Sequence, residues 1–481
     1  MRYGCLLGGD THCRIVNTTL ENNNMMTNEQ EHLRQIFAEA LDRVDPYKII
    51  TNRVTLEGDI LTVAMDEGDV VVDLQEFERI VVIGAGKATA KMALAIEEIL
   101  GSRIESGLIS VKYGHTEELE YIRTIEAAHP VPDDNSVRAA REIEELACST
   151  TDKTLVINLI SGGGSALLSS PMLADVDGEK IEVTLEDKQN TTKALLACGA
   201  DISEINCIRK HLSSLKGGRL LRCLRPARSL NFILSDVVGD NLDTIASGLT
   251  SYDRSTYCDA MSIIDNYELR DKIPAHVVRV LELGNTGKLL ETLKKEEFSE
   301  IRAENILIGT NRIALLGARD KAEELGYNAR MLTSRLQGEA ADAADMLWAV
   351  AQDEREWELL EKKPACIIVG GETVVTLKGD GKGGRNQEMA LQFLMRLGQD
   401  ERNGESIHFL AASTDGNDGP TDAAGGFADQ AVLERSREMG ISIAEYLKNN
   451  DSYHFLQTVG ALFKTGPTNT NVCDVQLLIV K

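Results

Sequence analysis

Short apolar runs alternate with helical patterns along most of the chain, and glycine-rich turns connect the two. Residues 80–83 form an apolar, β-branched run that is typical of a buried parallel strand. Gly84 and Gly86 then permit a tight turn, and the apolar spacing of residues 87–100 is helical. Another unit with this order begins at residue 306. Further strands are predicted at residues 107–111, 155–160, 231–234 and 409–413, with an edge strand at 475–480.

Repeated units of strand, glycine loop and helix predict an α/β fold with a mostly parallel sheet. Ligands of such sheets bind outside the carboxyl ends of the strands. Every loop considered below follows a predicted strand, so we expect these loops to converge on one crevice between two domains. A chain of 481 residues is long enough for two or more domains with separate cores.

The charge balance of the chain is strongly acidic. Its 51 Lys and Arg residues against 76 Asp and Glu give a formal net charge of −25, which argues against general binding to nucleic acid. A site for an anionic substrate must therefore be locally basic. No run of 18 apolar residues occurs, so neither a transmembrane helix nor a membrane partner is predicted.

The first residues differ in character from the rest of the chain. Residues 1–26 lack the continuous apolar stretch of a signal peptide and are predicted to form a disordered leader. A capping-box pattern from Thr27 to Gln30 predicts that the first helix starts directly after it. The nine cysteines contain no C-x-x-C pair, which indicates reduced thiols and a cytoplasmic protein.

Lys87 lies where the first of the predicted strands gives way to a helix. A helix amino terminus offers free N–H groups and a partial positive charge to an anion, and a lysine there adds a full charge. Gly84, Gly86 and Ala90 match the dinucleotide fingerprint, but the strand at 107–111 ends without the acidic residue that would hold a ribose. The turn therefore favours a phosphate ligand, with a plain turn and a solvated Lys87 as the alternative.

Two further glycine-rich loops follow predicted strands. Gly162, Gly163 and Gly164 stand directly before Ser165, and their uncovered N–H groups can form a nest for phosphate or carboxylate oxygens. This loop is neither a Walker A loop nor a G-x-S-x-G elbow, and a bare flexible turn is the alternative. The second loop places Arg385 at the start of a predicted helix, just as the turn after residues 80–83 places Lys87.

The most basic segment contains Arg209, Lys210 and His211, followed by Lys216 and Arg219 with a glycine pair between them. The glycine pair favours an anion contact over a solvated basic face. We expect Lys210 at the edge of the crevice.

Aspartates also follow two of the predicted strands. Asp236 and Asp240 come after residues 231–234, and Asp415 comes after residues 409–413. Carboxylates in such loops suit a hard cation that also binds phosphate oxygens. Aspartates are common in plain turns as well, which is the alternative.

A series of short motifs follows in a fixed order along the chain. The motifs are Gly84-Ala-Gly-Lys-Ala88, Ala128-His-Pro-Val-Pro-Asp133, Ser161-Gly-Gly-Gly-Ser-Ala-Leu-Leu168, Arg209-Lys-His-Leu-Ser213 with Lys216-Gly-Gly-Arg-Leu220, Ser235-Asp-Val-Val-Gly-Asp240, Gly370-Gly-Glu-Thr373, Gly383-Gly-Arg-Asn-Gln-Glu388, Thr414-Asp-Gly-Asn-Asp-Gly-Pro-Thr-Asp-Ala-Ala-Gly425 and Lys464-Thr-Gly-Pro-Thr468. Each motif alone is weak, but together and in this order they are highly specific. From about residue 27 onward the chain resembles the glycerate 2-kinase family, also called the hydroxypyruvate reductase-like or MOFRL family.

The resemblance implies a Rossmann-like amino-terminal domain, a smaller carboxyl-terminal α/β domain and an active site in the cleft between them. We place these domains at residues 27–300 and 301–481. The resemblance further implies ATP-dependent phosphorylation of D-glycerate, usually at the 2-hydroxyl to give 2-phosphoglycerate and ADP, by a monomer or homodimer. The residues that match Lys87 and Arg385 are the main catalytic cations of such kinases.

The other site residues combine this resemblance with the loops described above. Mg²⁺ that bridges ATP oxygens is assigned to Asp236, Asp240 and Asp415. Leu249 and Asn469 stand where the family usually has proline and glycine, and both changes affect loop stiffness more than chemistry. Nucleotide and substrate binding is assigned to Gly84, Gly86, Gly162, Gly163, Gly164, Ser165, Arg209, Lys210, Lys216, Asn311, Glu372 and Gly384.

Two other classes of protein stay open. An NAD(P)-dependent hydroxypyruvate reductase would use the Lys87 turn for a pyrophosphate, but the missing ribose acid opposes this class. A non-catalytic sugar-acid binding protein would need neither two cations at helix starts nor so many glycine loops. The sequence does not decide between the two hydroxyl groups of glycerate.

Overall fold

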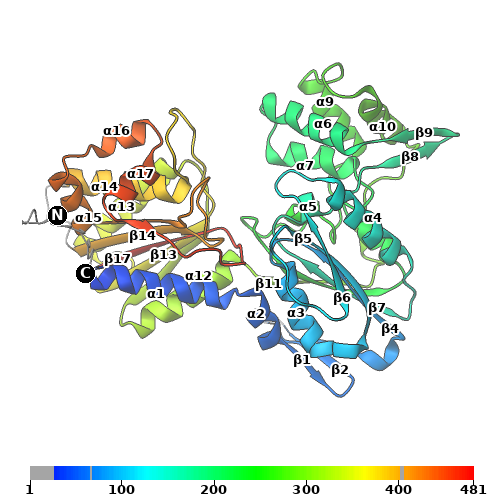
Figure 1. The fold of residues 1–481 in the computed structure, drawn as a ribbon, viewed down its shortest axis with the longest axis horizontal. Helices are drawn as coiled ribbons and strands as arrows, with labels where there is room; N and C mark the ends of the chain where they lie inside the picture. Colours follow the sequence, from blue (N-terminus) through cyan, green and yellow to red (C-terminus); the bar gives the residue numbers. More distant parts are fainter. Residues whose placement is uncertain (1–25, 66–67, 401–405) are drawn as a thin grey trace, which may run out of the picture.

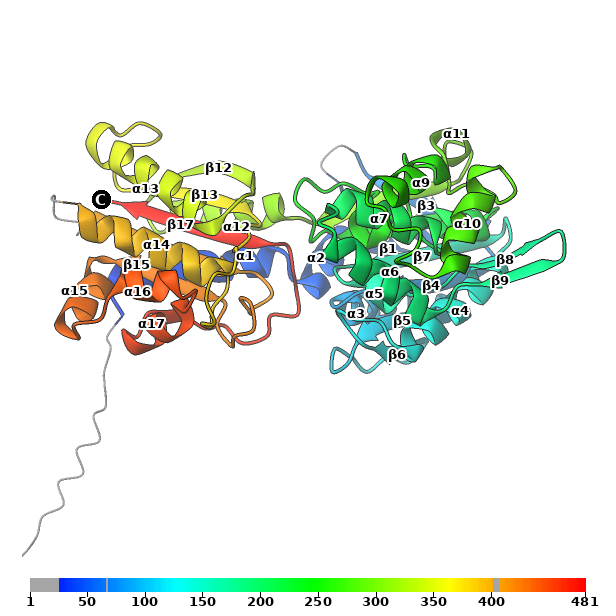
Figure 2. The same cartoon turned by 90° about the horizontal axis from the view of Figure 1, so that it is seen from above.

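The chain folds into two bodies, each built on a six-stranded sheet. The computed structural model describes residues 26–65, 68–400 and 406–481, so the predicted leader lies outside the described residues except for Met26. Figures 1 and 2 show the two bodies side by side along the long axis of the molecule. The predicted α/β fold with two domains is confirmed.

The first sheet is parallel throughout. From edge to edge its strands are β11 (Ala303–Gly309), β10 (Arg228–Leu234), β7 (Thr154–Ile160), β4 (Arg79–Ala85), β5 (Ile104–Lys112) and β6 (Ile122–Ala127). This is the strand order of a doubly wound, Rossmann-type sheet, and the order reverses between β4 and β7. A ligand of such a sheet binds beyond the carboxyl ends of the two strands at this switch point.

Both faces of the first sheet are covered, which explains why its strands are apolar along their whole length. Met92 and Ile96 pack on one face, and Ile143 and Leu221 pack on the other. The first face carries α2 (Pro46–Arg53), α3 (Thr89–Leu100) and a small antiparallel sheet of β1 (Val54–Glu57), β2 (Ile60–Val63) and β3 (Val70–Asp73), and the second face carries α4 (Asp134–Cys148), α5 (Gly164–Leu167) and α8 (Arg219–Leu224).

A helical layer with its own hydrophobic cluster lies beside the first sheet, at the upper right of Figure 1. Tyr257, one of the largest fully buried side chains, belongs to this cluster. The short helix α11 (Lys295–Phe298) then leads back to the sheet. The layer contains α6 (Leu185–Ala197), α7 (Ile202–His211), α9 (Tyr257–Asn266), α10 (Ala275–Asn285) and the hairpin of β8 (Leu173–Val176) and β9 (Glu179–Glu182).

The second sheet is mixed. From edge to edge its strands are β12 (Asn328–Leu336), β13 (Ala365–Gly371), β17 (Asp474–Val480), β14 (Ile407–Ser413), β15 (Gly425–Asp429) and β16 (Leu462–Phe463). Only the pair β12 and β13 is parallel. The prediction of an edge strand at residues 475–480 is wrong, because β17 lies between β13 and β14 and every one of its residues is buried.

Helices cover both faces of the second sheet. One face carries α1 (Asn28–Arg43) and α12 (Asn311–Glu324), and the other carries α13 (Ala340–Trp357) and α14 (Arg385–Gln399) (Figure 1). The predicted capping box at the start of α1 is confirmed, since Thr27 Oγ1 accepts from Gln30 N at 3.1 Å and Gln30 Oε1 accepts from Thr27 N at 3.3 Å. Three further helices complete this body: α15 (Gln430–Glu438), α16 (Ile443–Lys448) and α17 (Ser452–Thr458).

The two sheets divide the chain differently from the predicted boundary between residues 300 and 301. Strand β11 lies beyond that boundary but pairs with β10 in the first sheet. Helix α1 lies before it but packs on the second body, where the rings of Phe37 and Phe463 are 5.1 Å apart. We therefore propose residues 46–309 as one domain and residues 26–45 with 310–481 as the other.

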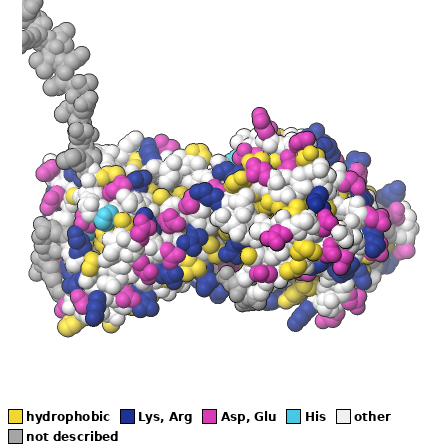
Figure 3. Space-filling view, turned by 90° about the horizontal axis from the view of Figure 1, so that it is seen from below, with side chains coloured by type: hydrophobic (Ala, Val, Ile, Leu, Met, Phe, Trp, Pro, Cys, Tyr) yellow, Lys and Arg dark blue, Asp and Glu magenta, His cyan; other side chains and the backbone are white. Residues whose placement is uncertain are grey.

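Acidic and basic side chains are intermixed over both bodies on the face shown in Figure 3. The locally basic site that the net charge requires must therefore be sought in the loops. No helix in the described ranges is long and apolar enough to cross a membrane.

Candidate active site

The loops that follow β4 and β7 interlock at the switch point of the first sheet. Lys87 N donates to Gly162 O at 2.9 Å, and Ala88 N donates to Ser161 Oγ at 3.0 Å. Gly86 has φ +151°, and a Cβ at this position would overlap Ser161 Oγ. Glycine is therefore required there, and the backbone around Lys87 is fixed by its contact with the second loop.

The loop after β7 presents backbone donors beside a carboxylate. Among the described residues, the amide groups of Gly162 and Gly163 have no hydrogen-bond partner. A Cβ on Gly162 would overlap the carboxylate of Asp236, so that side chain lies directly against the loop. The predicted nest and one of the predicted aspartates are thus brought together.

Within the described residues, the only ion pair of the Lys87 side chain is a long one. Its Nζ lies 3.8 Å from Asp415 Oδ2, a residue of the second body. A Cβ on Gly163 would contact the ring of His129, 2.9 Å from Cδ2, and the Cγ of Lys87 at 3.5 Å. Burial, with the charge of Lys87 as the next cause, lowers the pKa of His129 to about 4, so this imidazole is neutral near pH 7.

Arg385 is held far more tightly at the start of α14. Its Nε and Nη2 donate to the two carboxylate oxygens of Asp474 at 2.6 and 2.9 Å, and its Nη1 lies 2.8 Å from Glu372 Oε1. The Asp474 side chain is fully buried. Burial opposes the charge of Arg385, but the two carboxylates outweigh it and raise the pKa of the guanidinium.

Three carboxylates lie between the two cations and connect the two bodies. Cys473 Sγ donates to Asp236 O at 3.2 Å and lies 4.0 Å from Glu372 Oε2. Burial raises the pKa of Asp236 and of Glu372, and the charge of Asp415 adds to the rise in both. The loops of Lys87 and Arg385 therefore converge on one acidic neighbourhood, as the sequence predicts.

Asp240 lies outside the electrostatic influence of these carboxylates. Burial raises its pKa, while a hydrogen bond from Ser235 and the charge of Arg335 lower it, and no other carboxylate contributes. Among the described residues no group of three or more His, Cys, Asp or Glu side chains gathers closely enough to hold a metal. The assignment of a cation to Asp236, Asp240 and Asp415 stays a prediction.

Other assigned residues hold the loops of the second body in place. Asn311 Nδ2 donates to Val472 O at 2.8 Å and to Asp474 O at 2.9 Å, which fixes the chain beside the partner of Arg385. Gly384 packs so tightly that a Cβ there would overlap Asp418. Asn469 has φ +59°, the left-handed region in which glycine and asparagine are favoured, which explains why this asparagine can stand in a glycine position.

Asp418 and Asp474 were not identified from the sequence. Asp418 caps α14, since its carboxylate accepts from Asn386 N at 3.1 Å and from Gln387 N at 2.8 Å. Burial raises the pKa of Asp418 to about 6. A single aspartate directly before a long apolar run is the signal that could have singled out Asp474.

Most cations of the basic segment form hydrogen bonds with other groups of the protein. Lys210 is buried and its Nζ donates to Asp253 Oδ1 at 3.1 Å. Its expected place at the edge of the crevice stays a prediction. Lys216 Nζ donates to Ser165 O at 2.7 Å and Leu168 O at 2.9 Å and thereby holds the loop after β7. A direct ligand contact by either lysine stays a prediction.

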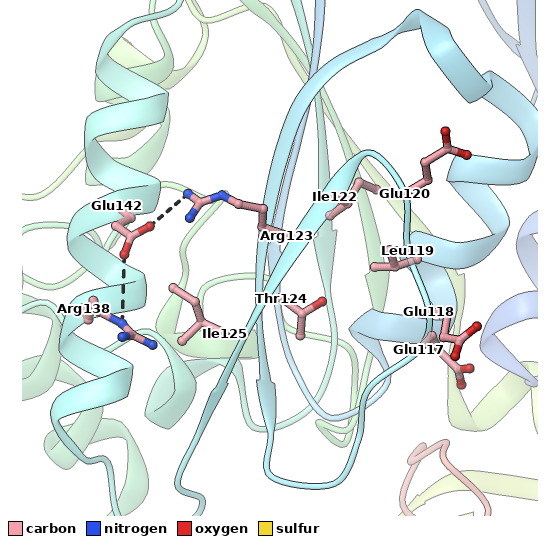
Figure 4. A pocket seen from close by; sticks show the side chains of 10 residues that line it. All are labelled: Glu117, Glu118, Leu119, Glu120, Ile122, Arg123, Thr124, Ile125, Arg138 and Glu142. Atoms are coloured by element: carbon pink, nitrogen blue, oxygen red, sulfur yellow. Dashed lines mark hydrogen bonds and ion pairs between the residues drawn. The ribbon is translucent and has the colours of Figure 1, made fainter.

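A cavity of about 690 Å³ lies away from these loops, beside β6 and α4 (Figure 4). Its two arginines are both paired with Glu142, Arg123 at 2.9 Å and Arg138 at 4.0 Å. Glu117, Glu118 and Glu120 line the opposite side. With its cations neutralised and further acids around it, this cavity does not suit an anionic substrate.

A doubly wound sheet that faces a second α/β body, with one cation from each at a helix start, is typical of enzymes that bind small phosphate-bearing anions. Comparison with known proteins agrees with this class. A model of the MOFRL family matches residues 365–474, and a model described as a domain of unknown function, DUF4147, matches residues 32–282.

Named relatives are similar to this chain along most of its length. The glycerate 2-kinase of Pyrococcus horikoshii is 39% identical over 93% of this chain and 96% of its own. The D-glycerate 2-kinase of Thermotoga maritima is 41% identical over 83% of this chain and 90% of its own. The crystal structure of a glycerate kinase from Thermotoga maritima has a TM-score of 0.80 at 36% identity and covers 94% of this chain and 99% of its own. The chain belongs to the glycerate 2-kinase, or MOFRL, family, which confirms the resemblance found in the sequence.

Proposed function

We propose that the protein transfers the γ-phosphoryl group of ATP to the 2-hydroxyl of D-glycerate, giving 2-phosphoglycerate and ADP. The observation that carries the proposal is the convergence of Lys87 and Arg385, from different bodies, on the group of Asp236, Glu372 and Asp415. Family membership supports glycerate as the substrate class. The 2-hydroxyl follows the naming of the relatives as 2-kinases.

The two cations suit the chemistry of phosphoryl transfer. Negative charge spreads over the phosphoryl oxygens in the transition state, so catalysis consists mainly of positioning and electrostatic stabilisation. The ion pair between Lys87 and Asp415 is long, so little interaction energy is lost when the Lys87 ammonium moves to contact a phosphoryl oxygen. The free N–H groups of Gly162 and Gly163 add neutral donors at the same switch point.

The carboxylates at the site fit a divalent cation that is bound mainly by phosphate. Mg²⁺ in kinases is usually held by one or two carboxylates together with substrate phosphates, and it neutralises charge on the β- and γ-oxygens. Asp236 is partly buried and its pKa is raised, so a cation beside it would stabilise the ionised form. We propose Asp236 and Asp415 as the two ligands, and we do not assign Asp240 to the metal, because no other carboxylate among the described residues acts on it.

The structure gives no support to the alternative of a nicotinamide-dependent reductase. Strand β5 ends at Lys112, and the residues after it are Tyr113 and Gly114. The acidic residue that would bind a ribose hydroxyl is therefore missing from the position where this strand order places it.

The test is a kinase assay on the purified full chain with D-glycerate, ATP and Mg²⁺, in which ADP release is coupled to NADH oxidation and the product is identified by ³¹P NMR. The proposal predicts equimolar ADP and 2-phosphoglycerate. A 3-phosphoglycerate product would overturn the choice of hydroxyl only. NADH consumption with hydroxypyruvate, in the absence of ATP and coupling enzymes, would favour the reductase instead.

A further inference from the structure

A lysine outside the assigned site is enclosed without any partner. Lys188 lies on α6, and the residue as a whole is half-buried, whereas its Nζ is fully buried. No group in the described part of the chain forms a hydrogen bond with this Nζ. An ammonium group that is removed from water and left unpaired is costly, so a lysine retained in this state points to a ligand.

A second cation without a carboxylate faces it from the next helix. Arg209 on α7 has no ion pair and no hydrogen-bonded partner for its guanidinium among the described residues. Burial, with the charge of Arg209 as the second cause, lowers the pKa of Lys188 to about 7, and no carboxylate contributes. In a chain with a net charge of −25, two neighbouring cations without an acid between them are unusual.

The pair lies beside the loops of the proposed kinase site. Lys216, whose own charge interacts with Lys188 and Arg209, donates to the carbonyls of Ser165 and Leu168 in the loop after β7. Gln189, the residue after Lys188, donates from Nε2 to Pro132 O at 3.0 Å, three residues after His129. The amino-terminal half of α6 is thus held against the loops that surround Lys87.

We propose that Lys188 and Arg209 form the subsite for the carboxylate of the hydroxy-acid substrate. The inference rests on the proposed function and names which end of the substrate these residues hold. A planar guanidinium binds a carboxylate through two parallel hydrogen bonds, and the enclosed ammonium supplies a third. The phosphoryl group is left to Lys87 and Arg385.

This subsite explains how the enzyme would reject neutral polyols. A carboxylate restores the partners that Lys188 and Arg209 lack, whereas glycerol would leave the buried ammonium and the half-buried guanidinium unpaired. Sites with buried polar groups discriminate strongly against analogues that cannot satisfy them.

The test compares Lys188→Met with Lys193→Met, which removes an exposed lysine from the same helix. Calorimetry on the full chain measures binding of D-glycerate, with and without ADP, and binding of ATP. We expect Lys188→Met to raise the Kd for D-glycerate at least about tenfold, to change the Kd for ATP less than about twofold, and to leave the melting temperature equal or higher. Arg209→Met should raise the Kd for D-glycerate in the same way. Lys193→Met should change neither Kd nor the melting temperature.

Other outcomes overturn the subsite. An unchanged Kd for D-glycerate in Lys188→Met, or a rise confined to ATP, would show that the pair does not hold the substrate carboxylate. A lowered melting temperature with equal weakening of both ligands would make Lys188 a structural residue. If the wild-type chain binds D-glycerate through Lys188 but transfers no phosphoryl group, the proposed function fails and the subsite stands. If turnover is normal and the Lys188→Met KM is unchanged, the subsite fails and the function stands.

Discussion

The turns that carry Lys87 and Arg385 look alike in sequence but hold their cations in opposite ways. The Lys87 turn is fixed through its backbone, and the ammonium itself has only a carboxylate at 3.8 Å. Arg385 is fixed through its side chain, by a bidentate contact with the fully buried Asp474 and by Glu372. The difference separates a cation that is free to follow a ligand from one that is preorganised before the ligand arrives.

Removing the divalent cation should affect both turns at once and has the largest expected effect. Excess chelator should reduce ATP-dependent turnover to background, because phosphate charge would then meet Asp236 and Asp415 without a cation between them. Asp236→Asn should raise the Mg²⁺ concentration for half-maximal activity by about tenfold or more. Asp240→Asn is the control, with a smaller shift since Asp240 lies outside the acidic group. Full turnover in chelator would exclude the metal assignment.

The second largest expected effect is a difference between Arg385 and Lys87 in their contributions to the free energy of unfolding. Arg385→Ala leaves Asp474 buried without its partner, which should lower the free energy of unfolding by about 3 kcal/mol. Lys87→Ala removes an ion pair that is long although partly buried, and it should change the free energy of unfolding by no more than about 0.5 kcal/mol. Urea titrations of the two variants measure this, and adding Asp474→Asn to Arg385→Ala should recover part of the loss. Equal losses in both variants would show that the two turns do not differ as described.

Lys188 extends the comparison to a cation that is both unpaired and enclosed. Its expected contribution, a pH dependence of the free energy of unfolding, is the smallest of the effects predicted here. Its folded-state pKa of about 7 lies below the ordinary value of 10.5, so the folded chain binds fewer protons than the unfolded chain between these pH values. The free energy of unfolding of the ligand-free protein should therefore rise with pH above about 7, by at most about 1.4 kcal/mol per pH unit from this group.

The matched variant isolates that contribution. The cations that act on Lys188 are Arg209 and Lys216, and both remain in Lys188→Met. Urea titrations at pH 7 and pH 9 should thus show a steeper rise for the wild-type chain than for the variant. Parallel pH profiles would mean that Lys188 already carries a counter-ion or solvent in the ligand-free protein.

The sequence predicts the loops of the site better than the partners of its side chains. Gly86 and Gly162 mark close backbone approaches that are local properties of a turn, so their place at the switch point could be expected. The salt bridge between Lys210 and Asp253 joins residues from separate elements, and no local pattern reveals it. The same holds for Arg385 and Asp474, which meet only because β17 inserts beside β13.

Strand order sets a similar limit on the fold. The apolar run of β17 predicts a strand, but its central place depends on pairing with β13 and β14, whose residues are distant in the chain. The packing of α1 on the second body has the same origin. Lys188 shows the limit for the site, since an isolated lysine in a helical pattern looks solvent-exposed until the structure encloses it.

The central claim is that Lys87 and Arg385 act on one transferred phosphoryl group, and the direct test is kcat for Lys87→Ala, Arg385→Ala and the double variant with D-glycerate and ATP. Loss of a cation that meets charge in the transition state costs on the order of 3 kcal/mol, so each single variant should lower kcat about a hundredfold or more. The double variant should lose less than the product of the two, because groups that act on one transition state are not additive. Near-normal kcat in Lys87→Ala with only KM raised would contradict the account and make the switch-point turn a binding loop.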